Sequence, residues 1–183
     1  MNKLLRVSKE TLYEFKQTRN VIFCGLMAAI AVILTYMTTI QIGPYIKIGF
    51  WGIPNRVIEL LFGPIVGGMF GATLDIIRYV VRPTGPFFLG FTISELASGV
   101  IYGLFLYKKP VKITRIAIAG LVEKVVVNCI LNTIWLSILY GKGFMMLISA
   151  RVIKNLIMWP IDTIILFIIL TYTVKLIKPH MKK

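Results

Sequence analysis

Long apolar segments separated by short polar connections dominate this sequence of 183 residues. Hydrophobic residues make up 57% of the chain and charged residues 15%, a balance that soluble domains do not have. Apolar stretches occupy residues 21–40, 63–81, 91–107, 115–140 and 146–177. Because about 20 apolar residues in a helix cross the hydrocarbon core of a bilayer, the sequence predicts an all-α integral membrane protein.

The connection between the first two apolar stretches, residues 41–62, holds too many glycine, proline and polar residues for a second long span. We expect an extended loop there, followed by a short helix over residues 54–62. The prediction is therefore six transmembrane helices with a short second helix, forming one domain over residues 21–177. Tails flank this domain at residues 1–20 and 178–183. The stretch 21–40 is too long for a signal-peptide core, so no cleavage is expected.

Basic residues are unevenly divided between the two ends of the predicted helices. Thirteen lie before residue 21, between residues 108 and 115, or from residue 175 onward, whereas the opposite connections hold Lys47, Arg82 and Lys142. The positive-inside rule then places both termini in the cytoplasm, with the chain in the plasma membrane. Because the net charge of +14 follows this topological pattern, no nucleic-acid partner is predicted.

Polar residues recur at helical spacing on both sides of the turn between the last two apolar stretches. Asn132 and Trp135 follow Asn128 by four and seven residues, and Arg151 and Asn155 repeat the spacing after the turn. An arginine inside a spanning helix costs roughly 2.5–3.5 kcal/mol at mid-depth, so it calls for a partner, a wet cavity or a ligand. These residues are predicted to form one wall of a small-molecule site.

Two further segments bring carboxylates to the same depth. Asp75 continues a row of glycines spaced four residues apart, and Glu95 follows the start of the next stretch. These groups lie roughly 7–14 Å below the outer surface at the rise of a helix. We therefore expect an outward-facing pocket, roofed by aromatic residues that include Trp51 and Phe88. An ion pair between Asp75 and Arg78, three residues apart, is the alternative explanation for those two charges.

No metal or cofactor site is predicted. Cys24 and Cys129 lie in apolar stretches without metal or redox spacing, so we expect buried, inert thiols. A membrane enzyme that uses the acidic residues is one alternative function, but no histidine lies within the apolar stretches, and Glu123 is expected to pair with the neighbouring Lys124. A purely structural subunit is another. Flat aromatic surfaces, amides, carboxylates and an arginine instead suit a planar heteroaromatic ligand with an anionic arm.

Five runs carry a resemblance to a known family: FGPIVGGMFGATLD (62–75), PTGPFFLGFTIS (83–94), SGVIYGLFLYKK (98–109), LNTIWLSILYGKGF (131–144) and ARVIKNLIMWPI (150–161). Over about residues 21–170 the chain resembles the folate-specific substrate-binding subunit, or S component, of energy-coupling factor (ECF) vitamin transporters. The resemblance implies a subunit that captures folate or reduced folates from outside. It also implies docking on a membrane coupling protein, the T component, with two ATPases.

The sequence is compatible with such partners because it lacks the GxxxxGK[ST] motif of a nucleotide-binding loop. An S component for riboflavin or thiamine shares the architecture and is the main alternative. We expect Asp75, Asn132 and Asn155 to form hydrogen bonds with the ligand and Trp51, Phe88 and Trp135 to stack on its rings. Arg151 and Lys47 are the expected partners of the glutamate carboxylates. Glu95 is the remaining residue of the predicted ligand-binding site. The resemblance further implies that Gly25, Ala28 and Ala29 face the coupling protein.

Overall fold

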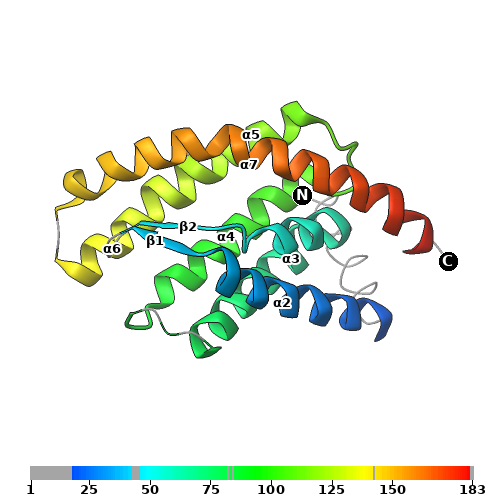
Figure 1. The fold of residues 1–183 in the computed structure, drawn as a ribbon, viewed down its shortest axis with the longest axis horizontal. Coiled ribbons are helices and arrows are strands. Elements are labelled where there is room, and N and C mark those ends of the chain that lie inside the picture. Colours follow the sequence, from blue (N-terminus) through cyan, green and yellow to red (C-terminus); the bar gives the residue numbers. More distant parts are fainter. Residues whose placement is uncertain (1–17, 43–45, 82, 84, 142, 182–183) are drawn as a thin grey trace, which may run out of the picture.

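The computed structural model describes residues 18–42, 46–81, 83, 85–141 and 143–181, and these are almost entirely helical (Figure 1). The predicted tails therefore lie largely outside the described residues. In chain order the elements are α2 (Thr18–Thr38), β1 (Ile40–Ile42), β2 (Ile46–Ile48), α3 (Ile53–Val81), α4 (Leu89–Leu106), α5 (Ile113–Glu123), the π-helix η1 (Lys124–Leu131), α6 (Asn132–Tyr140) and α7 (Phe144–Met181). Helix α7 runs beside the succession α5–η1–α6 in Figure 1.

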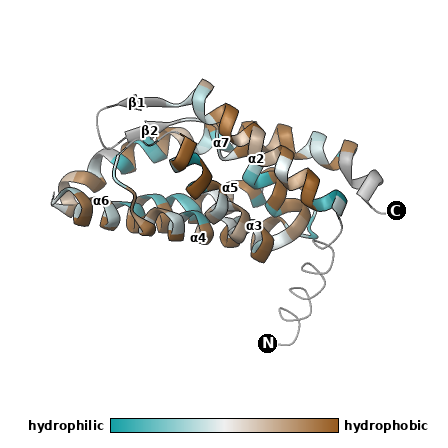
Figure 2. Ribbon diagram, turned by 90° about the horizontal axis from the view of Figure 1, so that it is seen from below, coloured by the Kyte–Doolittle hydropathy of each residue, from teal (hydrophilic) through white to brown (hydrophobic). Residues whose placement is uncertain are grey.

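Five helical stretches of the described chain are long and apolar enough to cross a membrane: Thr18–Thr38, Ile53–Val81, Leu89–Leu106, Ile113–Tyr140 and Phe144–Leu176. Much of the helical ribbon is accordingly brown in Figure 2. Helix α3 is broken at Gly63, whose φ of 80° and ψ of −171° are not helical. The break coincides with the predicted boundary between the short helix and the next segment. The fold is thus a helical membrane protein, as predicted, and the count of six spans remains a prediction.

Several threonine hydroxyl groups within the helices donate to a backbone carbonyl four residues earlier in the same helix. Thr35 Oγ1 donates to the carbonyl of Ala31 at 2.8 Å, and Thr163 Oγ1 donates to that of Trp159 at 2.8 Å. Such bonds remove the need for water, which is absent from a bilayer core. Large apolar side chains are exposed along α2 and α7, as expected for helices whose outer faces contact lipid.

The predicted extended loop after α2 forms a two-stranded antiparallel ribbon in which Ile40 pairs with Ile48 and Gln41 with Lys47. The backbone N–H of Phe50 then donates to Thr38 Oγ1 at 3.1 Å, which ties the end of this loop to the end of α2. The ribbon is a small addition to the predicted all-α fold. It brings the segment before α3 back over the helices.

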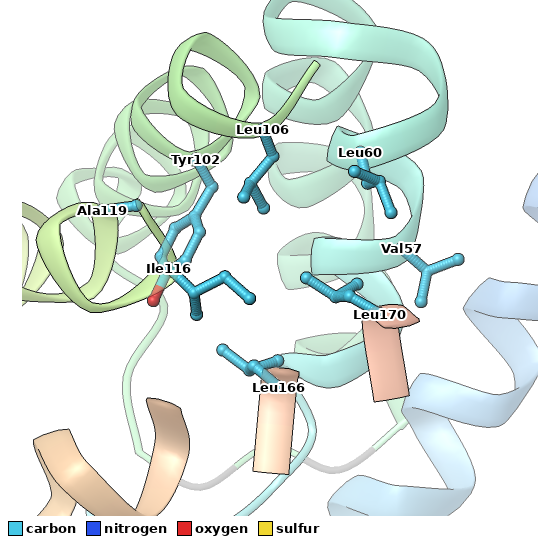
Figure 3. Close-up of a cluster of buried hydrophobic side chains, with 8 residues drawn as sticks. All are labelled: Val57, Leu60, Tyr102, Leu106, Ile116, Ala119, Leu166 and Leu170. Atoms are coloured by element: carbon cyan, nitrogen blue, oxygen red, sulfur yellow. The ribbon is translucent and has the colours of Figure 1, made fainter. Parts of the chain in front are cut away.

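Helices α3 and α4 pack with their backbones in close approach. A Cβ atom added at Gly99 would lie 2.5 Å from the carbonyl oxygen of Gly67 and 2.7 Å from the Cα atom of Gly68. Small residues at such positions let membrane helices approach closely, and Gly67 belongs to the row of glycines that precedes Asp75. Beside this contact lies a buried cluster of Val57, Leu60, Tyr102, Leu106, Ile116, Ala119, Leu166 and Leu170, contributed by α3, α4, α5 and α7 (Figure 3).

The predicted continuous helix over residues 115–140 is in fact three elements, because an eight-residue π-helix, η1, separates α5 from α6. A π-helix bonds i to i+5 and is wider than an α-helix, so it changes which residues share a face. Apolar periodicity over a membrane segment does not reveal such a change, since lipid-facing and core-facing residues are both apolar.

Candidate functional site

A cavity of about 430 Å³ lies between α3, α4, α7 and the succession α5–η1–α6. One end is closed by Tyr102 and Leu166, which belong to the buried cluster of Figure 3. The other end reaches the loop residues Trp51 and Phe87 and the last residue of α6, Tyr140. The cavity therefore runs from the loops toward the core, and its volume is in the range of small-molecule sites.

Seven of the nine predicted site residues line this cavity: Asn132, Arg151, Asn155, Asp75, Glu95, Trp51 and Phe88. Trp135 is not part of the lining; its Nε1–H donates to Ser94 Oγ at 3.1 Å, and its ring centroid lies 5.8 Å from that of Phe88. Trp135 therefore contacts two residues that line the cavity, Ser94 and Phe88, without lining it itself. Lys47 is on β2, and its side chain is outside the described part of the structure.

The wall formed by η1, α6 and α7 is held together around Asn128. Arg151 Nη1 donates to the backbone carbonyl of Asn128 at 2.8 Å, and Asn132 Nδ2 reaches Asn128 Oδ1 at 3.5 Å. Asn155 Nδ2 lies 3.3 Å from the sulfur of Cys129. Arg151 thus has a hydrogen-bond partner and also lines a cavity, which are two of the alternatives expected for an arginine in an apolar stretch.

The carboxylates on α3 and α4 lie on the opposite wall. Thr92 Oγ1 donates to Asp75 Oδ2 at 2.8 Å. The ion pair formed by Arg78 runs across the helix interface to Glu95, with 3.5 Å between Nη2 and Oε1. The link from Arg78 therefore joins two helices, whereas the alternative interpretation of the sequence placed it within one.

A buried charged cluster, which sequence reasoning missed, lies at the closed end. Arg56 Nη1 contacts the two carboxylate oxygens of Glu59 at 2.7 and 2.8 Å, and Nη2 donates to Ser98 Oγ at 2.8 Å. Its guanidinium carbon lies 3.8 Å from the centroid of the Tyr102 ring. The signal was present as an arginine and a glutamate three residues apart in a short apolar helix. Nothing in the sequence showed that both face inward.

A second charged group at this end was also missed. Lys124 Nζ lies 2.6 Å from Asp162 Oδ2 on α7, and Asn128 Nδ2 donates to Glu123 Oε1 at 2.8 Å. The expectation that Glu123 pairs with its neighbour Lys124 is wrong, because the lysine is engaged across the cavity wall. The five-residue step from Glu123 to Asn128 follows the π-helix and is invisible to an α-helical pattern.

Aromatic rings surround the loop end of the cavity. The centroids of Phe88 and Phe91 are 6.0 Å apart, and those of Tyr79 and Phe87 are 5.0 Å apart. The ring of Trp51 packs against Gly49. The cavity thus combines an aromatic end near the loops with a polar, charged end near the core. Such an arrangement suits a long planar molecule that carries several hydrogen-bonding groups.

The sequence and the fold are both similar to those of known transport proteins. The family described as "ECF transporter, substrate-specific component" matches residues 19–170. A "Folate transporter FolT" of Clostridium novyi (strain NT) is 38% identical over 152 residues, covering 83% of this chain and 88% of the relative. A protein of the same description from Leuconostoc mesenteroides is 30% identical over 160 residues, covering 84% and 85%. The solved "Crystal structure of FolT bound with folic acid" superposes with a TM-score of 0.76 at 32% identity, over 82% of this chain and 91% of that one.

Proposed function

Because the chain belongs to the family of substrate-specific components of ECF transporters, we propose that it captures folate or a reduced folate from outside the cell. The observation that carries this proposal is the likeness to a FolT structure that binds folic acid, at 32% identity over 82% of this chain. The cavity supports it with amides, carboxylates, an arginine and aromatic rings around one space. Riboflavin and thiamine, the alternative ligands, are not named in the descriptions of these relatives.

Each predicted site residue receives a role in this proposal. The amides of Asn132 and Asn155 and the carboxylates of the walls, Asp75 and Glu95, hydrogen-bond the pterin and the linker. Trp51 and Phe88 stack on the rings, and Trp135 holds Phe88 in place. Arg151 or Lys47 binds a carboxylate of the glutamate arm, because cationic side chains form charge-assisted hydrogen bonds with carboxylates.

The remaining steps of transport need partner subunits. We propose that the chain docks on a T component associated with two ATP-binding subunits, through the small residues Gly25, Ala28 and Ala29 on α2. This face is open: among the described residues no atom outside the backbone of α2 lies within 4 Å of a Cβ placed on Gly25, and the residues that α2 buries are Asn20, Cys24 and Ala31. We further propose six spans, counting the two parts of α3 separately, with both termini in the cytoplasm.

The proposal predicts tight and selective binding by the isolated subunit. Calorimetric titration of the purified protein in detergent is expected to give saturable 1:1 binding of folate and 5-formyl-tetrahydrofolate, near nanomolar, or about −12 kcal/mol. Riboflavin and thiamine should not compete. As a matched control, Lys112→Met removes an exposed charge remote from the cavity and should bind folate like the parent protein. Binding of riboflavin or thiamine instead of folate would keep the family and refute the ligand.

A further inference from the structure

The connection between α4 and α5, residues 107–112, carries positive charge that no nearby acidic residue in the sequence balances. It lies at the end of the molecule where the cavity is closed, because Val111 packs against the buried cluster of Figure 3. The stretch 96–122 contains no aspartate or glutamate. Its basic residues are Lys108, Lys109, Lys112 and Arg115. The proposed function gives this end of the molecule no role.

The acidic side chains of the described residues all lie inside the molecule. Glu59 is completely buried, and the others line the cavity, namely Asp75, Glu95, Glu123 and Asp162. Within the described part of the chain, Lys109 and Arg115 accordingly form no ion pair. The charge of the connection therefore remains available to an anion from outside the chain.

Neutral backbone groups fix the two cations. Lys109 Nζ donates to the carbonyl of Leu104 at 2.7 Å, and Arg115 Nη1 donates to that of Pro110 at 3.1 Å. A lysine has three N–H donors and an arginine has five. Each side chain is thus held in position by one hydrogen bond and keeps donors for a further acceptor.

The backbone of the connection is fixed as well. The ring of Tyr107 lies only 3.0–3.2 Å from the position of a Cβ on Gly63, and the residue is buried. Lys108 has a φ of 53°, which is uncommon for a residue other than glycine. Its Nζ lies 5.2 Å from the centroid of the Tyr107 ring. The cations are therefore presented from a connection that packs tightly against the turn at Gly63.

Exposed apolar side chains border the two cations. Leu104 on α4 is 46% exposed, and Ile113 and Ile118 on α5 are 45% and 52% exposed. Ile118 follows Arg115 by three residues, so it lies on the same face of α5, about 4.5 Å further along the helix. An occupant of this surface must therefore offer an anion next to apolar chains. An anionic phospholipid offers both, whereas an acidic soluble protein offers mainly the charge.

We propose that this surface binds an anionic phospholipid, with Lys109 and Arg115 at the phosphate and with Leu104, Ile113 and Ile118 along the acyl chains. Basic groups beside membrane helices bind such headgroups. A zwitterionic headgroup fits less well, because its ammonium group is repelled by the cations. The bound lipid holds the closed end of the molecule at the level of the headgroups. The site is independent of folate binding, because none of its five residues lines the cavity.

Native mass spectrometry of the full-length protein in a non-ionic detergent tests the proposal, because it counts bound lipids and gives their Kd. Phosphatidylglycerol should bind about tenfold or more tightly than phosphatidylcholine with the same acyl chains. Lys109→Gln and Arg115→Gln should each weaken phosphatidylglycerol binding about fivefold, the effect of one cation beside an anionic lipid surface. Arg115→Lys keeps the charge and should bind this lipid nearly as the parent protein does.

Arg19→Gln is the matched control, because it makes the same substitution at an exposed arginine in the first turn of another helix, α2. It should leave the affinity for phosphatidylglycerol unchanged. Equal losses in Arg19→Gln and Arg115→Gln would overturn the proposal, because the charges would then act without a defined site. Equal affinity of the unaltered protein for the two lipids would overturn it too, and that comparison needs no variant to fold.

A lipid is separated from a soluble anion by glycerophosphoglycerol, which is the headgroup of phosphatidylglycerol without acyl chains. It should compete at least about tenfold more weakly than the lipid, because it cannot bury the exposed apolar side chains. Competition as strong as that of the lipid would point to a soluble phosphate or an acidic protein and would overturn the proposal. Thermal unfolding without added lipid shows whether each variant is folded.

Discussion

Replacing Arg56 by methionine is expected to destabilise the protein by about 3–5 kcal/mol, the usual cost of breaking a buried ion pair by removing one partner. Glu59 is completely buried, and within the described part of the chain its carboxylate has an ion pair with Arg56 alone, at 2.7 Å. The variant also loses the bond to Ser98 and the contact with the Tyr102 ring. Thermal unfolding of the purified protein, followed by tryptophan fluorescence, measures the effect.

Two further variants separate the buried pair from a general loss of charge. Arg56→Met combined with Glu59→Gln removes both charges at nearly constant volume, so it should recover much of the lost stability. Lys112→Met removes a positive charge from an exposed position and should leave the unfolding temperature unchanged. An Arg56→Met protein as stable as its parent would show that this cluster contributes nothing to the fold.

The positions of most site residues could be predicted because a bilayer leaves polar side chains few places to lie. Asn132, Arg151 and Asn155 occur in apolar stretches at helical spacing, so they had to face a partner or a cavity. The structure places all three on one cavity. The depth of Asp75 and Glu95 below the outer surface, calculated from a fixed rise for each helical residue, was enough to predict that both line the same cavity.

The contacts at the closed end could not be predicted, because they depend on the rotation of helices about their axes. Whether Lys124 pairs with Glu123 or reaches Asp162 is decided by the π-helix, which the sequence does not reveal. The π-helix also explains why Trp135 does not line the cavity. An unbroken α-helix would turn it to the face of Asn128, whereas here it donates to Ser94 on α4.

The contact between α3 and α4 should be the least tolerant of added volume. Gly99→Val is expected to destabilise the protein by about 3 kcal/mol or more, at the upper end of overpacking effects. The atoms nearest to the added Cβ, at 2.5 to 2.7 Å, belong to the backbone of Gly67 and Gly68 and have no rotamer to change. Helix α3 would have to move and would carry Asp75 away from the cavity. The yield of monodisperse protein and its folate titration measure both losses.

Gly25→Val is the matched control, because it makes the same substitution in a membrane helix where no described atom outside that helix's own backbone lies within 4 Å of the new Cβ. Its folding and folate binding should equal those of the parent protein, so the loss in Gly99→Val would reflect helix packing rather than β-branching. In cells that also contain the partner subunits, Gly25→Val should still reduce folate uptake, because the added side chain occupies the proposed docking face. Equal uptake would place the coupling protein on another surface, and normal binding by Gly99→Val would mean that α3 and α4 need not touch.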